Sequence, residues 1–214
     1  MSFQSLYVTL IEDIDYTPII TFIQSHLQKH QTILDAGCGS GVVMVPLVEA
    51  GYSVIGVDLD PNMLSYAHQA LVEKSLPIQL FEHDLRTPLG QSFDVILLFN
   101  DVINYFKGAK LVLKNLKKAL NPSGFILMDL YKESYLEVMD GYIEDELEPV
   151  NYTWSTEVSK QVLNHTIEDD YGIYHVTQYV YPLKYYQDIL NDLGLTVEVL
   201  EGPDERKYYL KASL

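Results

Sequence analysis

The chain has 214 residues, of which 48% are hydrophobic, so it is long enough to bury a sizeable core in one compact domain. Its 14 lysines and arginines face 30 aspartates and glutamates, and the resulting formal charge of -16 disfavours a nucleic-acid substrate or an anionic membrane partner. The single cysteine, Cys38, excludes an internal disulfide framework and favours a reducing compartment.

The N-terminal segment shows no pattern typical of export. The first basic residue is Lys29, so no positively charged stretch precedes an apolar one. The longest apolar runs, such as 95–99, are too short to span a bilayer. We therefore expect a soluble cytoplasmic protein with no membrane partner.

Strand-like and helix-like segments alternate as far as Leu130. The spacing of apolar residues predicts helices over the segments 16–30, 42–50, 61–74 and 110–120. Runs of β-branched and apolar residues predict strands over the segments 32–36, 53–59, 78–82, 94–99 and 125–130. This alternation predicts an α/β fold of the doubly wound, Rossmann-like type, with a mostly parallel sheet covered by helices on both faces.

The pattern changes to short alternating runs between residues 151 and 181. The sequence Asp169-Asp170-Tyr171-Gly172 predicts a turn, and turns this short cannot make parallel crossovers, so we expect a small antiparallel β insertion. A helix over 182–193 and strands over 196–201 and 207–212 bring the predicted main sheet to seven strands in a single domain, 1–214. Because ligands bind beyond the carboxyl ends of such strands, we expect the insertion 151–181 to cover the ligand site there as a lid.

Three glycines follow the first predicted strand, in the sequence Asp35-Ala36-Gly37-Cys38-Gly39-Ser40-Gly41. Glycine lets the backbone turn sharply and approach a ligand closely, and the helix that follows offers unpaired N–H groups. The same pattern also fits a plain strand-to-helix turn, so the loop alone does not identify a ligand.

Asp58 ends the next predicted strand, about 20 residues after the glycine turn, where a carboxylate can accept hydrogen bonds from a ribose diol. Asp60 precedes Pro61 and is better placed to cap the next helix, which leaves Asp58 free for a ligand. A dinucleotide fingerprint would have glycine where this chain has Val42, and the difference disfavours NAD.

In order along the chain, these residues resemble the motifs of class I S-adenosylmethionine-dependent methyltransferases. The segment 35–41 is similar to the family's first motif and Asp58 to its ribose acid, while His83-Asp84-Leu85 is similar to its adenine site. The segment 93–100 is similar to its fourth strand and the loop facing the methyl group, and 120–125 to the turn before its fifth strand. The resemblance implies an S-adenosylmethionine site formed by Tyr16, Asp35, Gly37, Gly39, Gly41, Asp58, Leu59, Met63, Asp84, Leu85 and Asn100.

A further resemblance is to the bacterial small-molecule branch related to glycine and sugar-amine N-methyltransferases, whose extra strands roof the active site. It rests on Asp15-Tyr16, Asn104-Tyr105 and the insertion with Trp154. This chain departs from the branch at 176–180, where a His-rich, Arg-bearing segment is replaced by Val-Thr-Gln-Tyr-Val. The acceptor contacts that we expect are Tyr7, Asn104, Tyr105, Tyr131 and Trp154.

Methyl transfer from a sulfonium needs mainly the alignment of nucleophile, carbon and sulfur, and a base only where the acceptor must lose a proton. No catalytic group is therefore predicted, and the acid clusters lack calcium-loop spacing, so no metal is expected. The favoured function is transfer to nitrogen or oxygen of a small molecule, with S-adenosylhomocysteine as the second product.

Three alternatives remain open. The chain could bind S-adenosylmethionine without catalysis. It could be an NAD-dependent oxidoreductase, although it lacks a Tyr-x-x-x-Lys pair. It could also methylate nucleic acid, although 100–103 lacks the Asn/Asp-Pro-Pro-aromatic sequence of amino-directed base methylation. The acceptor and the oligomeric state are not predicted.

Overall fold

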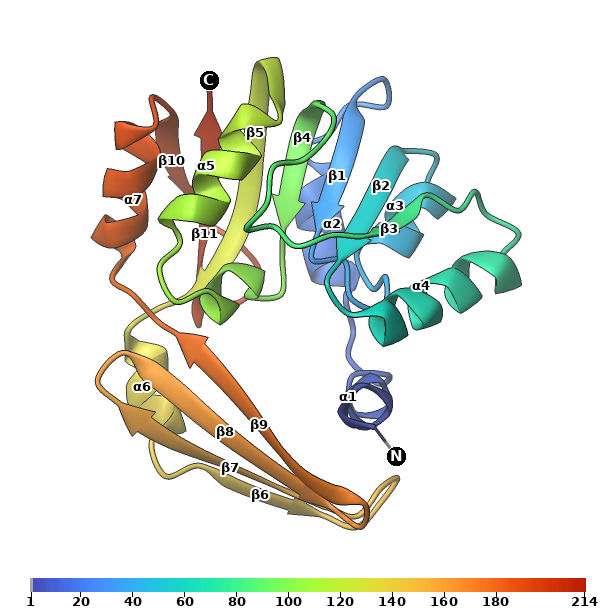
Figure 1. Ribbon diagram of the computed structural model, residues 1–214, viewed down its shortest axis with the longest axis vertical. Helices are drawn as coiled ribbons and strands as arrows, with labels where there is room; N and C mark the ends of the chain where they lie inside the picture. The colour runs from blue at the N-terminus through green and yellow to red at the C-terminus, as the bar shows by residue number, and fades with distance from the viewer. Residues whose placement is uncertain (1) are drawn as a thin grey trace.

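The computed structural model describes residues 2–214 and contains two separate sheets (Figure 1). The large sheet has the strand order β10-β11-β5-β4-β1-β2-β3, and the small sheet has the order β6-β7-β8-β9. The strands of the large sheet are β1 (Thr32–Ala36), β2 (Ser53–Asp58), β3 (Leu80–Glu82), β4 (Phe93–Leu98), β5 (Leu120–Tyr131), β10 (Thr196–Leu200) and β11 (Lys207–Ser213). Those of the small sheet are β6 (Ile143–Glu146), β7 (Tyr152–Ser159), β8 (Val162–Asp169) and β9 (Gly172–Tyr179).

Helices cover both faces of the large sheet. They are α1 (Phe3–Leu10), α2 (Thr17–Gln24), α3 (Met44–Glu49), α4 (Pro61–Glu73), the 3₁₀ helix η1 (Val102–Tyr105), α5 (Lys110–Lys118), α6 (Ser134–Met139) and α7 (Leu183–Asp192). Adjacent residues of β1 show the two-layer packing, because successive side chains of a strand point to opposite faces. Ile33 packs in the core with α2 and α3, whereas Leu34 packs in the core with α5 and α7. Within residues 2–214, no helix combines the length and the apolar character needed to cross a bilayer.

Strand directions confirm the predicted doubly wound fold. Strands β3, β2, β1, β4 and β5 pair in parallel, and β11 pairs antiparallel with both β5 and β10. The strand order reverses at the β1–β4 pair, where the crevice beyond the carboxyl ends of the strands is the usual ligand site.

The antiparallel sheet is larger than the sequence predicted. It begins at Ile143 on β6, ahead of the predicted boundary at residue 151, and is preceded by the unpredicted helix α6. Strand β6 has the acidic sequence Ile-Glu-Asp-Glu and leaves Ile143 65% exposed, so it has no buried face that an apolar alternation could reveal. Figure 1 shows this sheet facing the carboxyl ends of the central parallel strands.

The N-terminal helix α1 was also not predicted, and the helix predicted over 16–30 ends at Gln24. Leu6 is the one fully buried residue of α1, and it packs against Tyr152 and Ile167 of the small sheet. A short helix with one buried position gives little periodicity, and its partners here lie far away in the sequence. Figure 1 shows α1 near the end of the small sheet that lies away from α6.

Candidate active site

A cavity of about 460 Å³ lies beyond the carboxyl ends of the central strands, and its size is typical of small-molecule sites. The glycine loop after β1, the end of β2, the turn after β3, the loop after β4 and helix α1 form its walls. Among the residues predicted to bind cofactor or acceptor, those that line it are Tyr7, Tyr16, Gly37, Gly39, Asp58, Leu59, Met63, Asp84, Leu85, Asn100 and Tyr105. The predicted residues outside the lining are Asp35, Gly41, Asn104, Tyr131 and Trp154.

The glycine loop has the backbone that the sequence pattern requires. Gly37 has φ +82° and Gly39 has φ +53°, the left-handed region that favours glycine. A Cβ atom on Gly37 would lie 2.7 Å from Cγ1 of Val102, and one on Gly39 would lie 3.4 Å from Cε of Met63. Both glycines line the cavity, as do the Val102 and Met63 side chains beside them. A side chain added at either glycine would therefore fill space that a ligand needs.

Gly41 serves the fold instead of the cavity. It is buried, its φ is +88°, and an added Cβ would meet Cγ2 of Val45 at 2.9 Å and Cβ of Ala67 at 3.2 Å. The prediction that Gly41 contacts the cofactor stays a prediction, and Gly41 lies outside the lining of this cavity. Glycine is needed there because α3 and α4 pack closely against the loop.

Asp58 joins the end of β2 to the glycine loop. Its Oδ2 accepts a hydrogen bond from the Gly39 N–H at 2.8 Å, and its Oδ1 accepts one from the Asp60 N–H at 2.9 Å. The sequence correctly predicted that Asp60 caps α4, since Asp60 Oδ1 accepts from the Asn62 N–H at 2.8 Å. Asp58 does not cap the helix, as predicted, but its carboxylate also makes two bonds to the backbone. Each carboxylate oxygen nevertheless has a second lone pair that can accept from a diol at the cavity wall.

The turn after β3 supplies Asp84 and Leu85. The Arg86 side chain pairs with the Asp84 carboxylate at 2.7 Å, and its hydrogen bonds hold the pKa of Asp84 below the usual value. Leu85 is buried and lines the cavity beside it, so this end of the cavity combines an apolar contact with an ionised acceptor.

Asp35 lies under the glycine loop, 2% exposed and behind the cavity wall. Burial first, and the nearby Asp58 carboxylate second, together raise the pKa of Asp35 to about 7. Its Oδ2 has no hydrogen-bond partner. The structure thus places the first acid of the motif as a buried group supporting the loop, with no direct contact to the cavity.

The loop after β4 turns through two residues that are not glycine. Asn100 has φ +58° and Asp101 has φ +54°, a conformation that costs such residues roughly 1–3 kcal/mol each. Their N–H groups donate to the two carboxylate oxygens of Asp129, at 3.2 Å and 2.7 Å respectively. These bonds offset the strain and bring Asn100 to the cavity. Sequence reasoning missed Asp101 and Asp129 because neither belongs to a local motif.

Asn104, Tyr131 and Trp154 hold the two sheets in place and do not line the cavity. Asn104 is fully buried, with Nδ2 donating to the Tyr179 carbonyl at 2.9 Å and Oδ1 accepting from the Tyr131 N–H at 3.2 Å. Trp154 packs with the small-sheet cluster and donates from Nε1 to His165 Nδ1 at 3.2 Å. These bonds give the three residues structural contacts outside the cavity lining, and their expected contacts with an acceptor stay a prediction.

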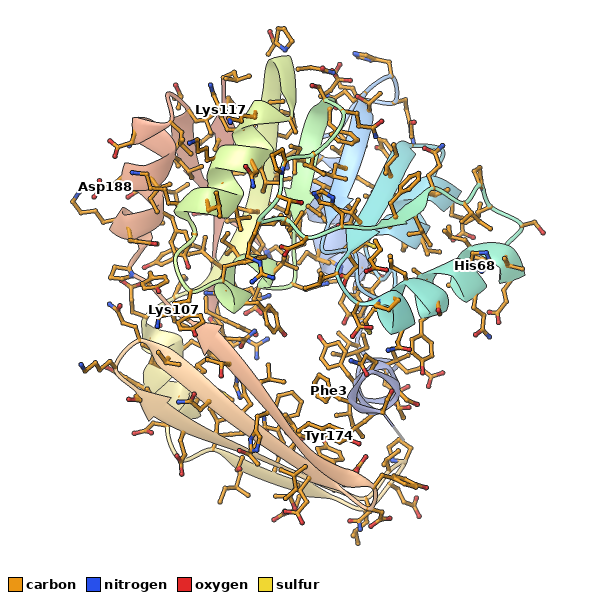
Figure 2. The ribbon with its side chains drawn as sticks, in the orientation of Figure 1. Phe3, His68, Lys107, Lys117, Tyr174 and Asp188 are labelled. Atoms are coloured by element: carbon orange, nitrogen blue, oxygen red, sulfur yellow. The ribbon has the colours of Figure 1, made fainter. Side chains whose placement is uncertain are left out.

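Helix α1 covers the cavity where the sequence predicted the insertion to do so. Phe3, Gln4 and Tyr7 line the cavity, and Gln4 Nε2 donates to Asp60 Oδ2 at 2.6 Å. Phe3 also contacts Tyr174 of β9 with ring centroids 5.6 Å apart, and Figure 2 shows these rings between α1 and the small sheet. Within residues 2–214, the lining includes no residue of β7, β8 or β9, so the small sheet supports α1 from behind.

Comparisons with known proteins agree with this geometry. Residues 33–124 match the model of a family described as "Methyltransferase domain". "Putative methyltransferase YqeM" of Bacillus subtilis is 30% identical over 210 residues, covering 90% of this chain and 84% of that protein. An S-adenosylmethionine-dependent methyltransferase of Clostridium acetobutylicum has a TM-score of 0.84 at 19% identity, covering 99% of this chain and 97% of that one. An S-adenosylmethionine-bound amino pentose methyltransferase of Micromonospora echinaspora has a TM-score of 0.76 at 18% identity, covering 100% and 98% of the two chains.

Proposed function

The chain belongs to the class I S-adenosylmethionine-dependent methyltransferases, and from that premise we propose that it methylates a nitrogen or oxygen atom of a small molecule, with nitrogen favoured. The observation that carries the proposal is the cavity closed by α1, which holds the donor-site residues and an adjoining group of tyrosines in one space. Its volume of about 460 Å³ suits a small-molecule acceptor better than a macromolecule.

The residues along the cavity are suited to the parts of S-adenosylmethionine. We assign Asp58 to the ribose diol, Asp84 and Leu85 to the adenine, and Gly37 and Gly39 to the amino-acid portion, and all five line the cavity. The bound donor supplies a methyl group already activated by its positive sulfur. The protein's task is then to align the acceptor and to exclude water, which needs no nucleophilic side chain.

Nitrogen is favoured because, in the part of the chain described, the lining residues that the loop after β4 contributes include no carboxylate or imidazole to deprotonate a hydroxyl. The lining side chains next to Asn100 in sequence or in contact with the loop after β4 include Val102, Tyr105 and Phe106, none of which is a carboxylate or an imidazole. Burial raises the pKa of Tyr7 and of Tyr105, so both hydroxyls stay protonated at neutral pH. An unprotonated amine can attack without a base. The Micromonospora relative also has an amino sugar in its printed description.

Donor binding is tested by isothermal titration and by thermal unfolding of the purified chain with S-adenosylmethionine, S-adenosylhomocysteine and NAD. The first two should bind and raise the melting temperature, because a ligand that binds only the native state stabilises it. NAD should do neither. Binding of NAD alone would instead support the oxidoreductase.

Methyl transfer is tested by incubating the chain with S-adenosylmethionine labelled in its methyl group and fractionated metabolite extracts. The label should enter a small basic compound, and the Asp58→Ala variant should incorporate less because donor binding weakens by roughly 1–3 kcal/mol. Labelled RNA, DNA or protein would contradict the acceptor class. Tight donor binding with no label transferred to any fraction would support a non-catalytic binding protein.

A further inference from the structure

A buried cluster of three charged side chains lies directly behind the loop after β4. Lys207 of β11 reaches Asp101 Oδ1 at 2.9 Å and Asp129 Oδ2 at 3.0 Å. The Asp129 side chain is fully buried, and those of Asp101 and Lys207 are 12% and 8% exposed. Charges this deep in a protein are costly unless they are paired. The net charge of the cluster therefore determines which sign of ligand charge is favoured in the adjoining cavity.

The donors around both carboxylates match the pattern of two ionised groups, although burial raises the pKa of Asp129. Asp129 accepts from the Asn100 N–H, the Asp101 N–H and Lys207 Nζ, and all three are donors. Asp101 accepts from Lys207 Nζ at 2.9 Å and from Gln178 Nε2 at 2.5 Å, which are also donors. Burial alone would lower the pKa of Lys207, but the two carboxylates outweigh it and raise that pKa. Two negative charges thus face one positive charge, and the cluster is left with a net charge of about -1.

A directed chain of hydrogen bonds runs from the small sheet to Asp101. Trp154 can only donate, so His165 Nδ1 must accept, and the ring proton must be on Nε2. That nitrogen donates to Gln178 Oε1 at 3.2 Å, which turns the Gln178 amide nitrogen toward Asp101 Oδ2. The chain thus presents a donor to Asp101 Oδ2, and Lys207 Nζ presents another to Oδ1, the arrangement that suits a carboxylate acting as an acceptor.

The excess negative charge acts on the cavity at the end near Asn100. Asn100 and Val102 flank Asp101 in the chain, and both line the cavity. After burial, the Asp101 carboxylate is the largest cause that raises the pKa of Tyr7 and of Tyr105, which also line it. Tyr105 is 44% exposed, but the space it faces is the cavity. A cation placed among these residues would meet an attractive field in a site partly shielded from solvent.

We propose that the Asp101–Lys207–Asp129 cluster is a fixed counter-charge that makes this end of the cavity selective for a cation, first the donor's sulfonium and then the methylated ammonium of an amine acceptor. The inference rests on the proposed function. When an amine lone pair forms the N–C bond, the C–S bond breaks with its electron pair left on sulfur, and the positive charge passes from sulfur to nitrogen. The cluster therefore faces one positive charge before and after transfer, and its arrangement need not change.

The test is to compare the binding of three ligands by isothermal titration near neutral pH. S-adenosylmethionine has a positive sulfur, sinefungin has an ammonium group near that position, and S-adenosylhomocysteine has neither. Wild-type protein should bind the two cations more tightly than S-adenosylhomocysteine. The Asp101→Asn variant should reduce the ratio of Kd for S-adenosylhomocysteine to Kd for sinefungin roughly tenfold, the scale expected for losing one nearby charge. Asp188→Asn, on the exposed face of α7, changes the net charge equally and should leave the ratio unchanged.

Each outcome has a distinct meaning. An unchanged ratio in a folded Asp101→Asn variant, checked by circular dichroism, would overturn the inference. If that variant does not fold, the wild-type ratio decides, because equal Kd values for sinefungin and S-adenosylhomocysteine would also overturn it. If none of the three ligands binds, the proposed function fails as well, whereas binding of all three without preference refutes only the counter-charge.

Discussion

Two loops at the carboxyl ends of neighbouring strands form the cavity, and they reach similar backbone conformations by different means. The loop after β1 has positive φ at Gly37, Gly39 and Gly41, where glycine adopts it without steric cost. The loop after β4 has positive φ at Asn100 and Asp101, where it is strained and is held by Asp129. The donor side is thus specified by local sequence, and the facing side by contacts between distant parts of the chain.

The largest effect should come from removing the support of the β4 loop. Asp129→Ala leaves Lys207 with one carboxylate and frees two backbone N–H groups, so the free energy of unfolding should fall by about 3–5 kcal/mol. Urea denaturation measures this change. The matched control is Asp188→Ala, which removes the exposed pair with Lys184 and should cost less than about 1 kcal/mol. Equal losses in the two variants would contradict the role assigned to Asp129.

A somewhat smaller effect should appear in the pH dependence of stability through Asp35. Its pKa in the folded protein is raised to about 7, above that of the unfolded chain, so it binds a proton more tightly when folded. Its contribution is therefore present at acid pH and is lost as the pH rises from about 4 to about 7. The loss should be of the order of 2–4 kcal/mol, and Asp35→Asn should remove it. The check is the free energy of unfolding of the wild-type protein and of Asp35→Asn, measured by denaturation across this pH range. If the two plots of free energy against pH run parallel, the role assigned to Asp35 is wrong.

The next prediction compares Gly37 of the glycine loop with Gly51, which differs from it in the space around an added Cβ. Gly37 and Gly51 have nearly equal φ values, +82° and +84°, but an added Cβ meets Val102 at the first and nothing within 4 Å at the second. Gly51→Ala should cost about 1 kcal/mol from backbone strain, and Gly37→Ala about 1–3 kcal/mol because it adds the clash. The double variant Gly37→Ala, Val102→Ala should recover the difference. Thermal unfolding measures all three, and no recovery would mean that the contact with Val102 is not the cause.

The smallest effect should come from the contact between α1 and α4. Gln4→Leu removes the hydrogen bond to Asp60 but keeps the N-cap bond from Asn62, so stability should fall by about 0.5–1.5 kcal/mol. If α1 closes the cavity, the dissociation rate of S-adenosylhomocysteine should rise several-fold in stopped-flow fluorescence. Gln28→Leu, in the exposed turn after α2, should change neither the stability nor this rate by a comparable amount. An unchanged dissociation rate in Gln4→Leu would remove α1 as the closing element.

The expected cover of the cavity shows what a correct local pattern leaves undetermined. Alternating residues over 151–181 predicted antiparallel strands, and β7, β8 and β9 confirm them. The pattern could not show that α1 lies between these strands and the cavity, because Leu6 finds its partners Tyr152 and Ile167 only when the two sheets face each other. The local pattern also could not show the partner of Trp154, whose indole donates to His165.

The sequence by itself determined the parts whose physical cause is local. Strand and helix periodicity, the glycine conformations of the β1 loop and the Asp60 cap each depend on residues within a few positions, so they are readable before folding. Only the tertiary structure decided the β4 loop, whose bonds join Asp101 to a residue 28 positions away in Asp129 and to one 106 positions away in Lys207. Such bonds exist because β4, β5 and β11 pair in one register, and no local pattern encodes which charged residues that register brings together.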